Sequence, residues 1–525
     1  MNGPFTLSPQ ELIQRLIDIV GESHVLTDEP ARRLFSSDAF WVGAPALAVV
    51  SPGTSAETAS VVGAVTSAGF AVVPRGGGMS YTKGYVADRA DAITLDMRRL
   101  DRTVAINAED LSITVEAGRT WKDIYESLKP LGLRTPYFGP MSGLRATVGG
   151  TLSNNSMFFG SGMYGTAADN VLSLKVALAD GSIMDTGSAG QENGAPFHRP
   201  FGPDLTGLFL SDAGALGVKL QATFRLIRAP SSTRFASFAF ETFEELFEAQ
   251  AEIARERLAA ECYAFDPFLN RSLKSLGAGQ SAIGTVANVV KSAGSLGQAI
   301  GDVATLARGG RGVVDEIAWS LHLVVEGFDE VVTDRALARL RRHALRRGRE
   351  IPATVPTVIR AEPFKDPGEF LLGHEGERWQ PIHACLPFSR VLEARRRTEE
   401  YFARQSAGID RFHVQTSLLT AVSGTDFIFE PAFYYPDAPA EFHRAFVADA
   451  ARLNRHAGMP GAREFVVEML TDLLSIYRDL GAVHQQLGRF YGYAEALSPI
   501  NAATLRSIRA ILDPRGLMNP GALGL

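Results

Sequence analysis

The stretch VVPRGGGMSYTKGY, from Val72 to Tyr85, places three successive glycines directly after a run typical of a buried strand. Glycine has no Cβ, so the backbone N–H groups of such a turn can converge on an anion without steric conflict. A pyrophosphate is an anion of this kind. The stretch is neither GxxxxGK[ST] nor GxGxxG, because no Lys-Ser/Thr pair follows the glycines. Taken alone, it is also consistent with a plain glycine-rich hairpin.

A second glycine-rich stretch runs from Gly139 to Ser182. Its glycines lie between short strand-like runs, at Gly139, Gly143, Gly149, Gly150, Gly160, Gly162 and Gly165. Interior glycines cost roughly 0.5–1 kcal/mol each, so their number indicates backbone lying flat against a large planar ligand. Two separate glycine clusters suggest a long ligand with two ends, and FAD is such a ligand.

The order of predicted elements indicates an α+β fold. Between Ala46 and Ile227, Val/Ile-rich runs alternate with helical patterns and glycine turns. The turn-rich segment Ala229–Thr233 marks a domain boundary. We therefore predict an N-terminal domain over 1–230, a second α+β domain over 231–469, and a return to the first domain over 470–525. In the second domain the patterns predict helices over Phe243–Leu258 and Thr333–Arg347.

Composition narrows the class of protein. The chain has 525 residues and is 46% hydrophobic, which is long enough for two cores. Its net charge of −6 arises from 58 acidic and 52 basic residues without a basic stripe, so nucleic acid is not an expected partner. Cys262 and Cys385 offer neither a disulfide framework nor a zinc site, no metal is expected, and a reducing cytoplasm fits best.

The N-terminal segment predicts a helix capped at Ser8, with Pro9 and Glu11 in its first turn, rather than a secretory signal. No apolar run is long enough to predict a transmembrane helix. One segment resists the α+β scheme: Leu273–Val314 is rich in Gly, Ala and Ser, with apolar residues at helical spacing. It reads either as a helix packed on the second domain or a subunit interface, or as a surface helix that touches a membrane or a redox partner.

Six motifs in a fixed order carry a family resemblance: SPGTSAETASVV, PRGGGMS, ATVGGTLSNN, YGTAADNVLSLKVALADG, SDAGALGV and DPRGLMNPG. Each is weak alone, and their order is specific. The sequence resembles the vanillyl-alcohol oxidase and p-cresol methylhydroxylase flavoproteins, and two segments, WQPIHACLPFS and FIFEPAFYYPD, resemble flavin D-lactate dehydrogenases. The resemblance implies a PCMH-type FAD-binding domain built from both ends of the chain, and a cap domain that covers the flavin and forms the substrate pocket.

The resemblance also implies which residues hold FAD. The loop from Arg75 to Ser80 matches the pyrophosphate cradle, and the segment around Thr147 matches the stretch beside the flavin. The expected cofactor-binding residues are Pro74, Arg75, Gly76, Gly77, Gly78, Met79, Ser80, Pro140, Thr147, Gly149, Gly150, Asn154, Gly160, Tyr164, Gly165, Gly217, Val218 and Asn519.

Members of the resembled family that tether the flavin do so through histidine. This chain has Met79 after the glycine loop and no histidine in the cap segment Asp426–Phe433. We therefore expect non-covalent FAD.

Two substrate classes stay open. In the phenol-oxidising members two tyrosines and an arginine bind a phenolate, and Tyr81, Tyr477 and Arg478 match them, with a shift in spacing for the last two. An arginine there would lower the pKa of the phenol. The aspartate that those enzymes place beside the flavin is replaced by Ser142 or a neighbour. The first expectation is a para-hydroxylated aromatic alcohol or alkylphenol.

The alternative substrate is a 2-hydroxy acid. His484 would act as the base, and Arg489 would bind the carboxylate with two parallel hydrogen bonds. The HxxGDGNxH metal motif of many such dehydrogenases is absent. A flavin-binding or redox subunit without catalysis of its own is the third reading. The expected partners are a small substrate, oxygen or an electron-acceptor protein, and a second copy of the chain in a homodimer.

Overall fold

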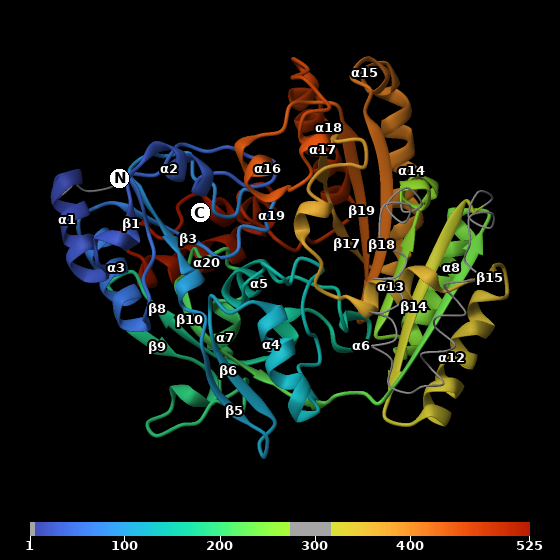
Figure 1. Ribbon diagram of the computed structural model, residues 1–525, viewed down its shortest axis with the longest axis horizontal. Helices are drawn as coiled ribbons and strands as arrows, with labels where there is room; N and C mark the ends of the chain where they lie inside the picture. Colours follow the sequence, from blue (N-terminus) through green and yellow to red (C-terminus); the bar gives the residue numbers. More distant parts are fainter. Residues whose placement is uncertain (1–5, 273–316) are drawn as a thin grey trace. The chain divides into compact units, whose positions relative to one another are not determined.

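The computed structural model describes residues 6–272 and 317–525, which form two compact units (Figure 1). The first unit holds the chain up to Ser156, Thr166–Arg228 and Gln485–Leu525, and the second holds Met157–Gly165 and Ala229–His484. Both units mix helices with sheets, as the α+β prediction requires. The segment Leu273–Val314, with its predicted helical stripe, lies outside the described residues.

A small sheet begins the first unit. Its strands lie in the order β1 (Val25–Leu26), β2 (Ala48–Val50), β4 (Ala92–Asp96) and β3 (Ala71–Arg75), and the last three are parallel. Helices α1 (Pro9–Val20) and α3 (Ser55–Ser67) pack together and share one core with this sheet. The Ser8 side chain accepts from Glu11 N, and Glu11 accepts from Ser8 N at 2.8 Å, so the predicted capping box is confirmed.

A five-stranded antiparallel sheet follows in the same unit. Its order is β5 (Thr103–Asn107), β6 (Ser112–Glu116), β10 (Val218–Arg225), β8 (Val171–Ala177) and β9 (Ile183–Asp185). Helix α5 (Val148–Asn154) packs on β6 and β10. The unit's other elements are α2 (Glu29–Phe35), α4 (Trp121–Leu128), β7 (Leu133–Arg134), α7 (Leu205–Leu208), β11 (Ile227–Arg228), α19 (Tyr493–Ala496) and α20 (Pro499–Leu512).

The end of the chain closes the first unit. After α20, Met518 forms a parallel bridge with Val72 of β3. Val72 N donates to Leu517 O at 2.9 Å and Asn519 N donates to Val72 O at 2.7 Å. Buried Asp513 accepts from the backbone N–H groups of Leu517 and Met518, which fixes the turn before the bridge. The glycine-rich, apolar tail is therefore part of the core.

The second unit is built on an eight-stranded antiparallel sheet. Seven strands lie in the order β15 (Arg349–Ile351), β12 (Ser232–Phe240), β14 (Trp319–Gly327), β13 (Glu261–Phe265), β18 (Gln415–Ser423), β19 (Asp426–Tyr435) and β16 (Arg378–Pro381), and β17 (Ala384–Leu386) pairs with β19. Figure 1 shows α8 (Phe243–Glu256) and α12 (Glu330–Ala344) alongside β14. The remaining helices are α6 (Ser161–Tyr164), α13 (Thr354–Ala361), α14 (Phe388–Arg404), α15 (Ser406–Arg411), α16 (Glu441–Phe446), α17 (Ala450–Leu453) and α18 (Ala462–Asp479).

The two faces of this sheet differ in chemistry. Trp319 of β14 contacts Phe243 of α8, so one face of the sheet is apolar and packs against the helices. Side chains alternate along a strand, so Ser320 and His322 point to the opposite face. There His322 lies against Tyr263 and Phe265 of the neighbouring strand β13.

Two chain segments fall differently from the sequence-based boundaries. The first unit resumes at Gln485 rather than at 470, because α18 packs on α14 of the second unit. The segment Met157–Gly165 belongs to the second unit, where Gly160 N donates to Glu261 Oε1 at 2.8 Å and Gly162 N donates to Ala260 O at 2.9 Å. A glycine-rich run without apolar periodicity gave no sign of that excursion.

The second unit should lose stability in mild acid. Burial lowers the pKa of His322 to about 3, between the hydroxyls of Ser237 and Ser320 at 2.9 Å each. Between the unfolded pKa near 6.5 and about 3, only the unfolded chain binds the proton, so stability is lost as the pH falls below about 6.5, by about 1.4 kcal/mol per pH unit. In urea unfolding, His322→Asn should flatten this slope. The exposed control His198→Asn should leave it unchanged, and equal slopes in both variants would contradict the assignment.

Candidate functional site

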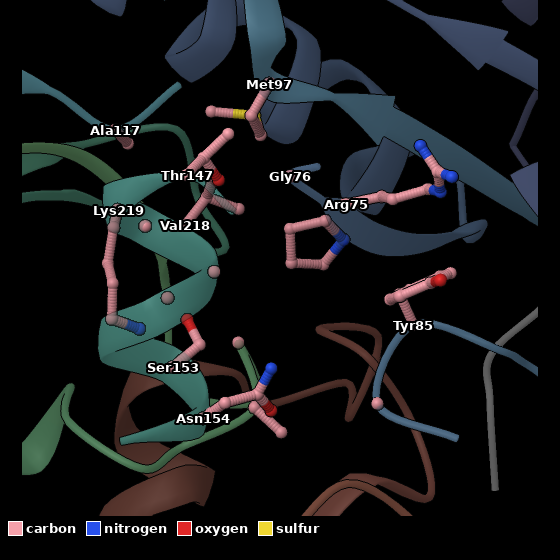
Figure 2. A pocket seen from close by; sticks show the side chains of 17 residues that line it. Arg75, Gly76, Tyr85, Met97, Ala117, Thr147, Ser153, Asn154, Val218 and Lys219 are labelled. Atoms are coloured by element: carbon pink, nitrogen blue, oxygen red, sulfur yellow. The ribbon is translucent and has the colours of Figure 1, made fainter. Parts of the chain in front are cut away.

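A cavity in the first unit brings the two glycine-rich stretches together (Figure 2). Its walls come from the end of β3 and the loop after it, from α5, and from the start of β10. The residues that line it are Pro74, Arg75, Gly76, Gly84, Tyr85, Met97, Ala117, Thr147, Gly149, Gly150, Ser153, Asn154, Ala213, Gly214, Gly217, Val218 and Lys219. Segments that are far apart in the sequence thus form one concave surface.

The expected cofactor residues divide into three groups. Nine of them line this cavity: Pro74, Arg75, Gly76, Thr147, Gly149, Gly150, Asn154, Gly217 and Val218. Six others belong to the same unit without lining it: Gly77, Gly78, Met79, Ser80, Pro140 and Asn519. Gly160, Tyr164 and Gly165 belong to the second unit. The glycine motifs therefore located the cavity. Several of their residues, such as Gly77, lie next to the lining residues and do not line the cavity themselves.

The glycine loop is shaped by its contacts with protein. A Cβ on Gly77 would overlap the carbonyl oxygen of Arg145, and one on Gly76 would overlap Thr147 Oγ1. Of the three successive glycines only Gly78 has a positive φ, at 76°. The glycines are thus needed because the loop presses against the turn before α5, which is a different reason from the clearance around a ligand that the sequence suggested.

Two side chains at the cavity have unusual polar environments. Thr147 Oγ1 is buried and has no hydrogen-bond partner in the described part of the chain. The guanidinium of Arg75 lies over the rings of Phe35 and Tyr85, at 4.5 and 5.1 Å, and Figure 2 shows it pointing away from Thr147. Burial lowers the pKa of Arg75. Arg75 therefore stabilises the loop from behind, whereas Thr147 offers a hydroxyl to a ligand.

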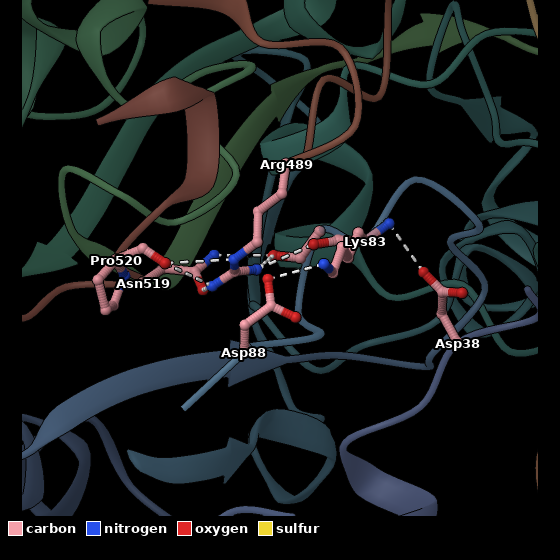
Figure 3. A network of polar contacts seen from close by, with 7 residues as sticks. Asp38, Lys83, Asp88, Arg489, Asn519 and Pro520 are labelled. Atoms are coloured by element: carbon pink, nitrogen blue, oxygen red, sulfur yellow. Dashed lines mark hydrogen bonds and ion pairs between the residues drawn. The ribbon is translucent and has the colours of Figure 1, made fainter. Parts of the chain in front are cut away.

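Arg489 has a structural role instead of the expected carboxylate clamp. Its guanidinium donates to the carbonyls of Lys83, Gly84 and Pro520 and to Asn519 Oδ1, at 2.6–3.2 Å (Figure 3). These bonds engage all three of its nitrogens, and burial lowers its pKa to about 10, which leaves the charge in place at neutral pH. Arg489 ties the loop after the glycines to the end of the chain.

Asn519 completes the same connection. Its Nδ2 donates to Gly84 O at 2.8 Å and to Ala213 O at 2.5 Å, and the residue is fully buried. The sequence resemblance placed this side chain among the cofactor-binding residues. In the structure it joins two cavity-lining segments, at Gly84 and Ala213, to the end of the chain, so it acts on the shape of the cavity.

Tyr81 and Gln486 meet in the first unit, where Gln486 Nε2 donates to the hydroxyl of Tyr81 at 3.0 Å. Gln486 was not anticipated as a site residue. Only its position within the polar run AVHQQLGRFYGY signals it in the sequence.

The other expected catalytic residues lie in the second unit. His484 Nδ1 bonds to the carbonyl of His383 at 2.8 Å, and its pKa is lowered to about 4 by burial, with a smaller contribution from the positive charge of Arg478. A carbonyl oxygen can only accept, so Nδ1 carries the proton and the ring is neutral at pH 7. His484 and Arg478 are thus electrostatic neighbours.

Tyr477 is placed differently from its expected role. The residue is fully buried in α18, its hydroxyl shares a hydrogen bond of 3.1 Å with Thr398 of α14, and its ring packs near Phe429. Burial raises its pKa. These contacts join α18 to α14, and they favour a packing role over phenolate binding.

The described residues show no helix long and apolar enough to span a membrane. Within the same residues, no group of three or more His, Cys, Asp or Glu side chains could hold a metal ion. A half-buried carboxyl that sequence reasoning missed is Glu430 of β19, and loss of hydration raises its pKa to about 7.

Comparison with known families identifies the cavity. Residues 46–187 match the FAD binding domain family, and residues 491–523 match the C-terminal domain of FAD linked oxidases. The glycine loop and α5 lie in the first match, and Asn519 lies in the second. The cavity is therefore that of an FAD-binding flavoprotein fold. Over these residues the chain therefore carries an FAD binding domain and the C-terminal domain of FAD linked oxidases.

Two curated relatives and one solved structure illustrate the likeness. The chain is 30% identical over 249 residues to the D-lactate dehydrogenase (cytochrome) of Arabidopsis thaliana, covering 47% of this chain and 42% of the relative. It is 28% identical over 234 residues to the D-2-hydroxyglutarate dehydrogenase of Xanthomonas citri pv. viticola, covering 45% and 47%. The matched parts span less than half of these relatives. The structure of p-cresol methylhydroxylase with substrate bound aligns with a TM-score of 0.73 and 16% identity, over 98% of this chain and 96% of that one, which shows a shared fold.

Arg489→Met should destabilise the FAD cavity from outside. The variant removes the donor to the partly buried carbonyls of Lys83 and Pro520 and one of the two donors to Gly84 O, so we expect a loss of about 2–4 kcal/mol in the free energy of unfolding and less bound flavin. Arg515→Met is the matched control in the same tail, because Arg515 bonds to the carbonyls of Thr66 and Ser67 near the surface. It should cost less than about 1 kcal/mol. Equal losses in urea unfolding of both variants would contradict the role of Arg489.

Proposed function

We propose that this protein is an FAD-dependent dehydrogenase or oxidase of 2-hydroxy acids. The observation that carries the proposal is the match to relatives named for D-lactate and D-2-hydroxyglutarate, which are both 2-hydroxy acids. The sequence alone put a phenolic substrate first and a hydroxy acid second. The curated relatives favour the second of these, and the likeness to p-cresol methylhydroxylase is a likeness of fold.

The cavity of the first unit fits the adenine dinucleotide. The loop after β3, the unpaired buried hydroxyl of Thr147 and the backbone of Gly149, Gly150 and Gly217 would hold it. Bound FAD supplies a hydride acceptor at its N5 atom. The protein must then hold the substrate C–H bond against that acceptor, take up the hydroxyl proton and exclude water.

His484 is the proposed base. Oxidation of a CH–OH group to a carbonyl releases a hydride from carbon and a proton from oxygen, so the proton needs an acceptor. The hydrogen bond from Nδ1 to the His383 carbonyl fixes the tautomer with the lone pair on Nε2, and the lowered pKa keeps it unprotonated at neutral pH. Arg478 supplies positive charge beside this histidine, which suits a substrate that carries a carboxylate.

The phenolic alternative has weaker support. It needs two tyrosines and an arginine around a phenolate, and Tyr477 is buried where α18 packs on α14.

The electrons from the reduced flavin would pass to oxygen or to an electron-acceptor protein. We also propose that the protein is a cytoplasmic homodimer.

Non-covalent attachment of FAD is part of the proposal. Met79 follows the glycine loop and β19 contains no histidine, so neither place offers the tether that the sequence resemblance implies. Acid precipitation of the yellow protein should release the flavin into the supernatant, measured by its absorbance. A washed pellet that stays yellow would mean a covalent bond to another side chain.

The substrate proposal predicts opposite roles for His484 and Tyr81. His484→Asn keeps a donor toward the His383 carbonyl and removes the base, so anaerobic flavin bleaching by D-lactate or D-2-hydroxyglutarate should slow by about a hundredfold or more. Tyr81→Phe is the control, and it should change that rate less than about threefold. FAD content must be equal in all samples.

Three outcomes would contradict it. Bleaching by para-hydroxylated benzylic alcohols alone, with strong dependence on Tyr81, would restore the phenolic reading. An undiminished rate in His484→Asn would remove this histidine from the chemistry. A wild-type protein that takes up no FAD would overturn the whole proposal.

A further inference from the structure

Two ionisable side chains are buried together at the FAD cavity, outside every motif assigned above to the cofactor. Lys219 of β10 lines the cavity, and its Nζ lies 2.5 Å from Oδ1 of Asp212. The lysine and aspartate side chains are 3% and 1% exposed. Removing the two charges from water costs several kcal/mol per ion, and their mutual attraction must offset that cost. A function at the cavity would explain why the pair is buried there.

The carboxylate is held rigidly. Asp212 Oδ1 also accepts from Gly214 N at 3.0 Å, and the backbone on both sides of it is docked on α5, because Ser211 N donates to Leu152 O and Ala213 N donates to Ser153 O. Ala213 O in turn accepts from Asn519. Asp212 therefore cannot move to follow the lysine, and it fixes where the ammonium group lies.

The lysine is aimed by its strand. The register of β10 against β8 shifts between Lys219 and Gln221, and irregularities of this kind redirect a side chain. Lys219 lines the cavity, and Figure 2 shows its side chain running along α5 with the amine at the level of Ser153. The strand thus brings a cation to the wall of the cavity.

The pair is only partly satisfied by protein. An ammonium group has three N–H donors, and Lys219 makes one hydrogen bond in the described part of the chain. Asp212 Oδ2 is buried without a partner there. Among the residues that line the cavity, Arg75 is the other cation, and its guanidinium is stacked on Phe35 and Tyr85. Lys219 is therefore the cation that can reach a ligand.

We propose that Lys219, oriented by Asp212, is a phosphate-binding residue of the FAD site, and that its ammonium group contacts the diphosphate. The inference rests on the proposed binding of FAD and adds a charged contact to a cradle otherwise made of backbone and Thr147. Asp212 is the positioning residue. Its negative charge balances the buried lysine before the cofactor binds, and it opposes the diphosphate afterwards.

The direction in which FAD affinity changes in three variants distinguishes a phosphate-binding lysine from a purely structural ion pair. With a phosphate contact, Lys219→Met should raise the Kd of the apoprotein for FAD by about 10- to 100-fold, the range of a hydrogen bond to a charged group. Asp212→Asn keeps the Oδ1 acceptor for both Gly214 N and Lys219 Nζ and removes the opposing charge, so it should bind FAD as tightly as wild type or more tightly. The double variant Asp212→Asn/Lys219→Met should bind as weakly as Lys219→Met.

The experiment titrates apoprotein with FAD by flavin fluorescence, and with ADP and adenosine as competitors. The loss in Lys219→Met should appear with ADP and stay below about twofold with adenosine. Lys175→Met is the matched control: Lys175 pairs with Asp185 at 2.8 Å on the adjoining strands β8 and β9 of the same sheet, away from the cavity lining. It should leave every Kd unchanged. Thermal unfolding of each apoprotein checks that the variants fold.

Three results would overturn the proposal. They are unchanged FAD affinity in Lys219→Met, wild-type affinity restored in the double variant, and an equal loss with adenosine, which would move the contact to the nucleoside. The double variant carries no unpaired buried charge, so it keeps the test valid even if Lys219→Met alone folds poorly. Failure of wild type to bind FAD would refute the proposed function itself, which is a different outcome.

Discussion

The bond between the end of the chain and strand β3 is the constraint on which the FAD cavity depends. Val72 is clamped between Leu517 and Asn519, and the glycine loop leaves β3 three residues later. The Asn519 side chain then joins Gly84 to Ala213, so one amide fixes segments that contribute to different walls. A cavity assembled in this way cannot form until both ends of the first unit are in place. The cradle is therefore a property of the whole unit, and the glycine loop alone does not contain it.

Local patterns predicted the parts of the fold that local physics determines. Short-range spacing predicted the capping box at Ser8 and the α+β order of elements. It also predicted helix α8 from its first residue, Phe243, and a helix that overlaps most of α12. The glycine motifs found the cavity, because close approach of backbone to backbone leaves few alternatives to glycine. They did not separate glycines that face the cavity from those, such as Gly77, that pack against a neighbouring turn.

The structure differs from the sequence-based expectations where a residue's contacts come from partners far away in the sequence. Arg489 looked like a carboxylate clamp, and its actual acceptors come from residues 83, 84, 519 and 520. Tyr477 looked like a phenolate ligand, and Thr398 on another helix takes its hydroxyl. The segment Met157–Gly165 belongs to the second unit, where it bonds to Glu261 and Ala260. Nothing in the glycine-rich run itself predicts these contacts. No spacing rule encodes such contacts.

Hydrogen-bond saturation separates these roles better than residue type does. Arg489 and Arg360 are both partly buried cations. The first donates to four protein groups, and the second pairs with the buried side chains of Glu261 and Glu326. Each makes a closed set of interactions, and closed sets stabilise a unique arrangement of the chain. Lys219 differs, because one rigid carboxylate engages one of three donors in a cavity that other walls complete. A lysine is a compact charge whose remaining donors can turn toward an oxyanion, whereas a saturated arginine fork has none to give. The chemistry of recognition in this protein therefore lies with the groups that the fold leaves incompletely bonded at the FAD cavity, namely Lys219 and Thr147.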